Sequence, residues 1–419
     1  MNQYVMAVPG KRQISGNDKI FSINKSAQDM ASKVGPENVV NATIGALLDD
    51  KGTLMVMPSI IDIYKSLSPV EISEYAPIAG VPSFLEYVKS AIFGSYIPEG
   101  YIEAVATPGG TGAIRNTIQN YSSMDDAVLT TDWFWGPYRT ISDELGRKID
   151  TFTMFDKENN LNIASFESKV NYLLKRQSHL VVLFNAPAHN PTGFTPSHQE
   201  WDALTHVLKK EARNFEKKVT LFIDAAYIDF AGDPDSSRSF FSKFSNLPEN
   251  IMVIVAFSMS KGYTLYGMRS GAMICITPNK TIAQEFKTVN MYSNRATWSN
   301  GTRPAMMILS KIFEDNQLSK KVAAERAEFK NTLEKRAAVF MDYAEKFNLE
   351  MCPYKAGFFM TIPCHNAEAV GNQLQKDSIF IVPIGKGLRF AVSAVSEEKC
   401  KIVPEKIATA INTVTKGNG

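Results

Sequence analysis

Residues 251–261 read Ile-Met-Val-Ile-Val-Ala-Phe-Ser-Met-Ser-Lys, an unbroken apolar run that ends in small polar side chains and a lysine. A run that is apolar at consecutive positions predicts a strand buried on both faces, as in a parallel sheet. Similar runs recur at Leu180–Phe184, Val219–Ile223 and Ala272–Ile276, and Ser197–Phe215 between two of them has apolar residues at helical spacing. This alternation predicts an α/β fold whose mostly parallel sheet is covered by helices on both faces.

The sequence after Gly301 has a different pattern. Lys321–Phe347 carries one apolar stripe opposite a face rich in Lys, Arg and Glu, which predicts a long amphipathic helix. Shorter strand-like pieces follow it at Gly357–Ile362, Ile379–Val382 and Leu388–Val392. We therefore expect a second, smaller α+β domain in the C-terminal part of the chain.

These patterns predict three parts of the chain. Residues 46–305 form the large domain, residues 306–419 form the small domain, and residues 1–45 form an N-terminal arm that belongs partly to the small domain. The polar stretch Gly232–Ser239 predicts a surface loop.

Composition excludes several classes of protein. The 419 residues are 44% hydrophobic and 21% charged, which is ordinary for a globular chain. A net charge of +2 gives no electrostatic reason to expect a nucleic-acid partner. Four cysteines and five histidines, without close Cys–Cys spacing, predict neither a disulfide framework nor a metal site. The absence of a secretory leader pattern and of a membrane-spanning run predicts a cytoplasmic protein.

Polar residues directly follow three of the apolar runs. Ligands of open α/β sheets bind at the carboxyl ends of the strands, so these residues are the first candidates for a site. Lys261 follows one run, and as a neutral amine it could form a Schiff base with an aldehyde cofactor; alternatively it is a surface lysine. Asp224 ends another run, where it could bind a ligand cation or cap a helix, and Tyr227 follows it.

Three other stretches carry binding chemistry. Asn190-Pro-Thr-Gly is a turn signal that places an amide after a buried strand. The glycine-rich stretch Thr107–Ala113 precedes an apparent helix at Ala113–Tyr121, and such a helix start binds anions. Arg389 lies in a predicted strand. Its guanidinium group could bind a carboxylate through two parallel hydrogen bonds, or it could form a surface ion pair.

Taken together and in this order, the motifs resemble those of the class I and II family of pyridoxal-phosphate-dependent aminotransferases, which have fold type I. The residues that carry the resemblance are Gly45, Tyr75, Gly109, Gly110, Thr111, Trp135, Asn190, Asp224, Tyr227, Ser258, Lys261, Arg269 and Arg389. They span most of the chain.

The resemblance implies a role for each residue toward the cofactor. The residue matching Lys261 forms the Schiff base and then transfers protons. The residue matching Asp224 pairs with the protonated pyridine nitrogen. Those matching Tyr227 and Asn190 bond the phenolic oxygen. An aromatic matching Trp135 stacks on the ring, although Trp133 is a nearby rival.

The resemblance also implies residues that hold the phosphate and the substrate. The phosphate contacts match Gly109, Gly110, Thr111, Ser258 and Arg269. Tyr75 matches a tyrosine that reaches the phosphate of the neighbouring subunit, which implies a homodimer with shared sites. Arg389 matches the arginine that grips the substrate α-carboxylate, and Gly45 matches a glycine in a loop that closes over the substrate. Asn190 also lies where it would face the substrate. The implied reaction moves an amino group from an amino acid to a 2-keto acid by a ping-pong mechanism.

Two positions depart from the family's pattern. Dicarboxylate-specific members carry an arginine just ahead of the stretch that matches Met291–Asn294, where this chain has Val289. The departure predicts a preference for aromatic or other apolar amino acids, unless the nearby Arg295 takes over that contact. The second is Gly109, where many relatives carry a hydroxyl residue, so one phosphate contact is lost.

Two other functions share these residues. A carbon–sulfur β-lyase, a decarboxylase or a synthase on the same scaffold would need the same Lys261, Asp224 and Arg269. A non-catalytic ligand sensor is the other alternative, but such regulators carry an N-terminal DNA-binding module, and here the motifs begin by Ile44.

Overall fold

The structure is a computed structural model that describes Met6 and residues 19–417. The backbone divides into two compact units. Unit 1 comprises the described part of Met1–Met55 together with Ala188–Thr195 and Ala327–Gly419, and unit 2 comprises Val56–Pro187 and Pro196–Arg326. Residues 1–5 and 7–18 of the expected N-terminal arm lie outside the described residues.

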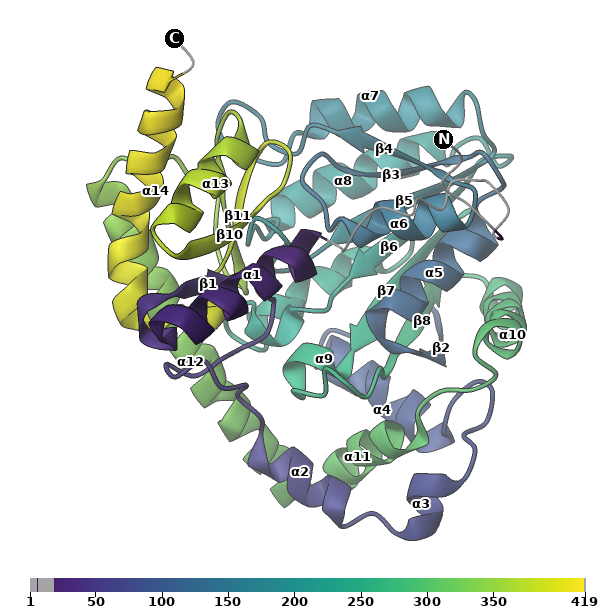
Figure 1. Ribbon diagram of the computed structural model, residues 1–419. Helices are drawn as coiled ribbons and strands as arrows, with labels where there is room; N and C mark the ends of the chain where they lie inside the picture. The colour runs from purple at the N-terminus through teal and green to yellow at the C-terminus, as the bar shows by residue number, and fades with distance from the viewer. Residues whose placement is uncertain (1–5, 7–18, 418–419) are drawn as a thin grey trace. The chain divides into compact units, whose positions relative to one another are not determined.

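Unit 2 is built on a seven-stranded sheet with the strand order β2-β8-β7-β6-β5-β3-β4 (Figure 1). The strands are β2 (Tyr101–Thr107), β3 (Ala127–Thr131), β4 (Lys148–Phe152), β5 (His179–Asn185), β6 (Lys218–Asp224), β7 (Ile251–Ser258) and β8 (Gly271–Thr277). Strands β3 to β7 are parallel, whereas β8 is antiparallel to both β7 and β2. The predicted mostly parallel sheet is confirmed. The run Ala272–Ile276 is a strand, but it is antiparallel, because burial on both faces does not encode direction.

Helices cover both faces of this sheet. The helices of unit 2 are α2 (Pro58–Lys65), α3 (Pro69–Ser73), α4 (Pro82–Phe93), α5 (Gly109–Tyr121), α6 (Pro137–Glu144), α7 (Ile163–Leu174), α8 (His198–Glu211), α9 (Met259–Gly262), α10 (Lys280–Thr297) and α11 (Arg303–Glu314), with 3-10 helices η2 (Ile228–Phe230) and η3 (Ser236–Phe244), and α2 and α3 pack on α11 rather than on the sheet. The prediction of a surface loop at Gly232–Ser239 is wrong from Ser236 onward, because the 3-10 helix η3 begins there. The phenylalanines and Arg238 of η3 are buried, which stabilises this turn of helix in a polar sequence.

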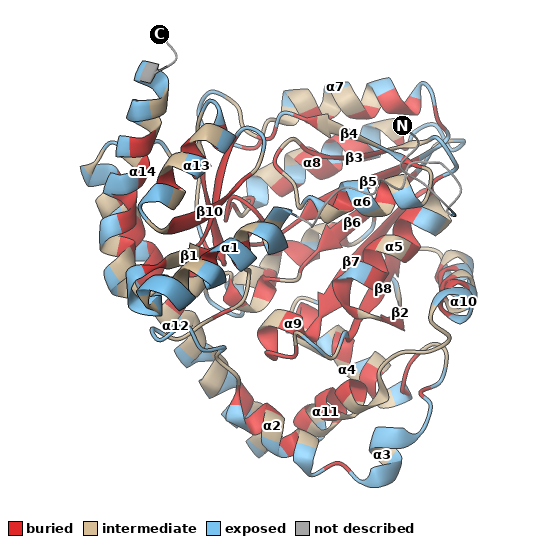
Figure 2. Cartoon of the chain, viewed as in Figure 1, coloured by how far each residue is buried: buried red, intermediate tan, exposed pale blue. Residues whose placement is uncertain are grey.

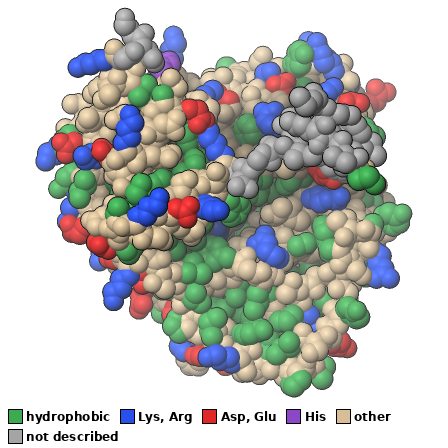
Figure 3. Space-filling model, viewed as in Figure 1, with side chains coloured by type: hydrophobic (Ala, Val, Ile, Leu, Met, Phe, Trp, Pro, Cys, Tyr) green, Lys and Arg blue, Asp and Glu red, His purple; other side chains and the backbone are tan. Residues whose placement is uncertain are grey.

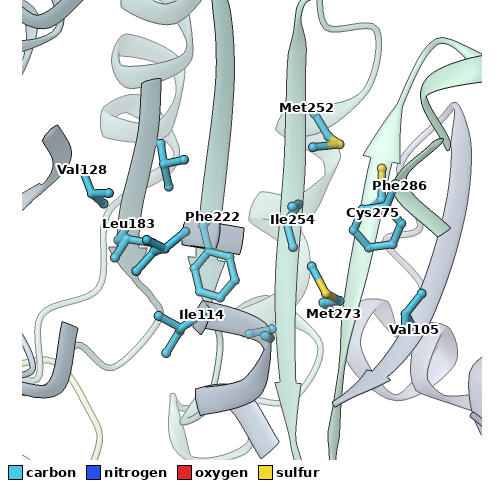
Figure 4. Packing of buried hydrophobic residues seen from close by; sticks show 14 of the residues in the cluster. Val105, Ile114, Val128, Leu183, Phe222, Met252, Ile254, Met273, Cys275 and Phe286 are labelled. Atoms are coloured by element: carbon cyan, nitrogen blue, oxygen red, sulfur yellow. The ribbon is translucent and has the colours of Figure 1, made fainter. Parts of the chain in front are cut away.

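One face of the sheet packs on α5, α6 and α10, and Figure 4 shows Ile114 of α5 and Phe286 of α10 among the strand residues. Successive inward positions alternate along the strands, as in Val181 and Leu183 of β5 or Met273 and Cys275 of β8. Ile114 of α5 lies among them. Burying a side chain of this size is worth about 1.5–3 kcal/mol, so the cluster fixes α5 firmly on the sheet.

Aromatic contacts join the other face to α4, α7 and α8. Phe84 of α4 contacts Phe257 of β7, and Trp201 of α8 contacts Phe184 of β5. Figure 2 shows the central strands as buried along their length. The apolar runs in the sequence have this continuous pattern because helices cover both faces.

Unit 1 contains a four-stranded sheet with the order β1-β10-β11-β9. Its strands are β1 (Val40–Ala42), β9 (Phe359–Pro363), β10 (Ile379–Pro383) and β11 (Gly387–Ala391), and its helices are α1 (Lys19–Val34), α13 (Ala367–Lys376), α14 (Glu397–Gly417), η1 (Pro36–Asn38) and η4 (Val392–Ala394). Strand β1 is parallel to β10, so residues 40–42 join the sheet of the C-terminal residues. The long helix α12 (Asn316–Lys346) crosses the division between Arg326 and Ala327, so the division falls later than residue 306.

The surface carries charges of both signs. Blue and red side chains are interspersed over the face seen in Figure 3. No helix among the described residues is long and apolar enough to cross a membrane.

Candidate active site

The carboxyl ends of β6 and β7 meet the start of α5 in unit 2. Asp224 ends β6 and Ser258 ends β7. A Cβ atom placed on Gly110, in the first turn of α5, would lie 3.9 Å from Cβ of Ser258 and 4.0 Å from Oδ1 of Asp224. The fold therefore brings together three of the residues predicted from the sequence.

Gly109 and Arg269 form a cradle at the N-terminus of α5. Gly109 has a positive φ of 65°, and a Cβ atom on it would lie 2.9 Å from Nη2 of Arg269. Arg269 donates from Nη1 to Oγ of Ser260 at 3.1 Å and to the carbonyl of Tyr266 at 2.9 Å. Thr111 is exposed in the same turn. The helix N-terminus and the guanidinium both favour an anion, so this cradle fits a phosphate.

A side chain at position 109 would meet the guanidinium of Arg269. A positive φ also disfavours any residue with a Cβ.

Lys261 lies in the short helix α9, directly after β7, and is half-buried. Its Nζ lies 5.7 Å from the ring centroid of Tyr227 and 4.5 Å from that of Tyr266. Tyr227 was predicted to lie here, whereas Tyr266 was missed. Nothing in its sequence surroundings distinguishes Tyr266 from an ordinary loop tyrosine.

Asp224 is buried, with 6% of its surface exposed, and receives a hydrogen bond from the hydroxyl of Tyr138 at 2.7 Å. The backbone N–H of Ala226 donates to its other oxygen at 3.3 Å. Burial raises the pKa of Asp224 above its ordinary value, while the Tyr138 hydrogen bond acts in the opposite direction. Burial also keeps the pKa of Tyr138 well above its ordinary value, so its hydroxyl stays protonated.

Tyr138 was missed by the sequence analysis. It lies three residues after Trp135, on the first turn of α6, and the rings of the two residues meet edge to face at 5.6 Å. The backbone N–H of Tyr138 donates to the carbonyl of Trp135 at 2.9 Å, and no pattern in the sequence indicated the contact of Tyr138 with Asp224. Trp133, the rival aromatic, is buried in the core, whereas Trp135 is only partly buried.

Tyr75 is predicted to reach a neighbouring subunit, and its side chain is 84% exposed. Its carbonyl accepts a hydrogen bond from Arg303 at 3.4 Å, and Arg303 also pairs with Glu74 at 2.8 Å. The segment is thus held by its backbone while the ring of Tyr75 faces outward.

Unit 1 holds Arg389, Gly45 and Asn190. Arg389 on β11 is buried and donates from Nη2 to the carbonyl of Thr43 at 2.6 Å. Its guanidinium carbon lies 4.5 Å from the ring centroid of Phe359, and a Cβ on Gly45 would lie 2.3 Å from Cζ of the same ring. The glycine therefore permits close packing beside the aromatic ring that supports Arg389.

Asn190 is buried in the segment Ala188–Thr195. The carbonyl of Pro191 accepts a hydrogen bond from Thr361 of β9 at 2.8 Å, which ties this turn to the small sheet. In unit 2 the structure thus brings together Gly110, Asp224 and Ser258, places Gly109 beside Arg269 and Lys261 near Tyr227, and in unit 1 it places Gly45 and Arg389 against the same ring.

The residues of unit 2 fit pyridoxal phosphate. The cradle matches a phosphate, the buried carboxylate of Asp224 matches a ring cation, and Lys261 supplies the amine for a Schiff base. The mostly parallel sheet with helices on both faces has the fold of pyridoxal-phosphate-dependent aminotransferases, fold type I.

The comparisons identify the family. The family model described as Aminotransferase class I and II matches residues 37–407. The aspartate aminotransferase of Escherichia coli is 24% identical over 72% of this chain and 76% of its own length. The mitochondrial aspartate aminotransferase of Schizosaccharomyces pombe is 25% identical over 95% of this chain and 89% of its own length. The chain belongs to the aminotransferase class I and II family and is a pyridoxal-phosphate-dependent enzyme.

Solved structures agree with this fold. An aminotransferase from Anaerococcus prevotii has a TM-score of 0.95 and 41% identity, covering 98% of this chain and 100% of its own. An aromatic-amino-acid aminotransferase from Burkholderia pseudomallei, covalently bound to pyridoxal phosphate, has a TM-score of 0.80 and 21% identity, covering 95% and 98%. The second likeness concerns the fold alone.

Proposed function

We propose that this aminotransferase moves the amino group of an L-amino acid with an aromatic or apolar side chain to a 2-keto acid. The reaction has two half-reactions, in which one product leaves before the second substrate binds. The observation that carries the proposal is the grouping of Asp224, the Gly109–Arg269 cradle and the Lys261 helix at one end of the sheet of unit 2.

The residues of unit 2 would hold the cofactor at both of its ends. When bound, pyridoxal phosphate supplies an aldehyde that condenses with amines and a ring that accepts electrons. Gly110, Thr111, Ser258 and Arg269 would bind the phosphate at the start of α5. Asp224 would hold a proton at the ring nitrogen, because a buried carboxylate gains most from an adjacent cation.

Lys261 is the proposed acid and base. Its Nζ would move the proton from the α-carbon of the first substrate to the cofactor, and in the second half-reaction it would move a proton back to the α-carbon of the second substrate. Tyr227, whose ring lies near Nζ, would bond the phenolic oxygen of the cofactor together with Asn190. Trp135 would contact the cofactor ring, since Trp133 is buried in the core.

Arg389 would bind the α-carboxylate of the substrate. Its position is set by the Thr43 carbonyl and the Phe359 ring, which leaves the direction of the guanidinium fixed before the substrate arrives. Gly45 lies against the same ring and belongs to the segment expected to close over the substrate, and Asn190 would also face the substrate.

Two observations support a preference for apolar side chains. Val289 on α10 cannot bind a second carboxylate. Arg295, the possible substitute, is exposed near the end of α10 and donates to Oγ of Ser299 at 2.6 Å. A local hydrogen bond therefore already engages this arginine.

A homodimer is proposed from the exposure of Tyr75. Val70 and Ile72 of α3 are also exposed, and Figure 3 shows hydrophobic side chains over the region of α2, α3 and α11. Exposed apolar groups of this kind are typical of a subunit interface. The ring of Tyr75 would then reach the phosphate of the neighbouring subunit.

A steady-state comparison tests the substrate proposal. With 2-oxoglutarate as acceptor, we expect phenylalanine and tyrosine to exceed aspartate in kcat/KM by roughly 10-fold or more, since aspartate would leave its second carboxylate unpaired. A higher kcat/KM for aspartate would contradict the proposal. Release of ammonia and pyruvate without any acceptor would instead indicate a β-lyase.

A further inference from the structure

Unit 2 contains a buried group of three charged residues that no motif in the sequence indicated. Asp229 lies on η2, Arg238 on η3 and Arg326 on α12. The side chains of Asp229 and Arg238 are 10% and 8% exposed, and that of Arg326 is 19% exposed. Charged groups this deep need a structural or functional reason, because removing them from water is costly.

The two arginines share one carboxylate oxygen. Nη2 of Arg238 lies 2.6 Å from Oδ1 of Asp229, and Nη1 of Arg326 lies 3.6 Å from the same atom. Burial by itself would raise the pKa of Asp229, but the attraction of the two guanidinium groups outweighs it and lowers the pKa below the ordinary value. The carboxylate is therefore ionised, and the group carries a net positive charge.

This ion triad contacts the residue next to Lys261. Nε of Arg326 donates to the carbonyl of Gly262 at 2.7 Å. A Cβ atom on Gly262 would lie 1.8 Å from Oδ2 of Asp229, so the carboxylate packs directly on the glycine. The guanidinium of Arg326 also lies 4.6 Å from the ring centroid of Tyr263, the following residue.

The contacts fix both the Cα atom and the carbonyl group of Gly262, the residue that follows Lys261. The carbonyl side is held by a charge-assisted hydrogen bond, which is about twice as strong as a neutral one. The Cα side is held by close packing that only glycine allows. A movement of either Asp229 or Arg326 would therefore move the backbone that carries Lys261.

We propose that Asp229, Arg238 and Arg326 are positioning residues for Lys261, because their ion triad fixes the Gly262 peptide and with it the direction of the lysine side chain. The inference rests on the proposed role of Lys261 as acid and base. It assigns a function in catalysis to residues that would not touch the cofactor or the substrate.

Two variants of the full-length protein loaded with pyridoxal phosphate test the inference. D229N removes the anion and keeps the shape of the side chain. G262A keeps all three charges but forces the carboxylate of Asp229 away from residue 262, so it serves as a second variant if D229N fails to fold. The control is D150N, which removes the anion of the Lys169–Asp150 pair, 2.8 Å long and also in unit 2.

Three measurements are made on each variant. They are the rate at which borohydride fixes the cofactor to Lys261, the pH midpoint of the absorbance of the bound cofactor, and kcat and KM. We expect D229N to lower the midpoint by at least half a pH unit, because the lost anion leaves two uncompensated cations near the lysine. Both D229N and G262A should lower kcat at least 10-fold and change KM less than threefold, and D150N should match the wild type within twofold.

The outcomes separate this inference from the proposed function. A folded D229N or G262A protein with the wild-type midpoint, trapping rate and kcat overturns the inference. So does a failure of both variants to fold, since the triad would then serve folding rather than the lysine. A wild-type protein that borohydride cannot link to pyridoxal phosphate at Lys261 overturns the proposed function instead.

Discussion

Two buried aspartates five residues apart, Asp224 and Asp229, have opposite surroundings. Asp224 accepts hydrogen bonds from neutral donors, the Tyr138 hydroxyl and the Ala226 N–H, and burial raises its pKa. Asp229 faces Arg238 and Arg326, and their charges lower its pKa despite burial. A cationic ligand would further stabilise the ionised form of a carboxylate that has only neutral donors. A carboxylate that already faces two cations gains no such stabilisation from a ligand. The surroundings thus distinguish Asp224, the proposed partner of the cofactor, from Asp229, whose charge is balanced within the protein.

The largest expected effect is on stability at Asp229. D229N would leave buried Arg238 and partly buried Arg326 without their anion, and removing one partner of a buried ion pair costs about 3–5 kcal/mol. Urea unfolding of the protein without cofactor measures this loss. D150N, at a partly exposed pair, should cost roughly 0.2–1 kcal/mol. Equal losses in the two variants would mean that the triad contributes no more than a surface pair.

The next effect is on catalysis at Asp224. D224N replaces the carboxylate by a neutral amide that cannot hold a charged partner, and removing one such electrostatic contact lowers kcat roughly 10²–10³-fold. Borohydride should still link the cofactor to Lys261, because the lysine remains. A kcat of D224N within a few-fold of the wild-type value would contradict the proposed role of Asp224 at the cofactor, and Asp224 would then not differ in function from Asp229.

The smallest effect is expected at Tyr138, and it depends on pH. Y138F removes a donor from buried Asp224, which costs about 1–3 kcal/mol while the carboxylate is ionised. Folding raises the pKa of Asp224, because burial disfavours the ionised carboxylate. At a pH above this raised pKa, burial of the ionised group therefore lowers the stability of the protein. This loss of stability disappears as the pH falls through the raised pKa and the carboxylate takes up a proton. Losing the hydroxyl raises the folded pKa further. The stability deficit of Y138F should therefore be larger at pH 8 than at low pH.

Unfolding by urea at several pH values measures the deficit. A difference between Y138F and wild type that stays constant with pH would show that the hydroxyl does not act on the ionised form of Asp224. D224N/Y138F is the matched control, since its second substitution should then have no pH-dependent effect.

Much of the fold could be predicted because each central strand is apolar at nearly every position. The runs at Leu180–Phe184, Val219–Ile223 and Ile251–Phe257 lie in β5, β6 and β7. The direction of β8 could not be predicted, because an antiparallel strand covered on both faces has the same composition as a parallel one. The 3-10 helix at Ser236–Phe244 was also missed, since its stability comes from burial of Phe240, Phe241 and Phe244 rather than from local propensity.

The candidate site was predictable where a residue follows a recognisable strand or turn. Lys261, Asp224 and Gly110 are of this kind. Tyr138, Asp229 and Arg326 were not, because each acts through a partner distant in the sequence, and single residues on polar helices give no signal of such contacts. Sequence patterns thus indicate groups placed by the backbone, but not the side chains that hold those groups in position.

The antiparallel pairing of β7 and β8 has a consequence for how this site can vary. Ser258 at the end of β7 pairs with Gly271 at the start of β8, so the connection between them begins and ends at one point of the sheet. That connection carries both Lys261 and Arg269. An insertion or deletion between Lys261 and Arg269 would change the spacing of the amine and the guanidinium, whereas an exchange of the whole connection between relatives would preserve it. Recombination at Ser258 and Gly271 should therefore be tolerated better than a change of length between them.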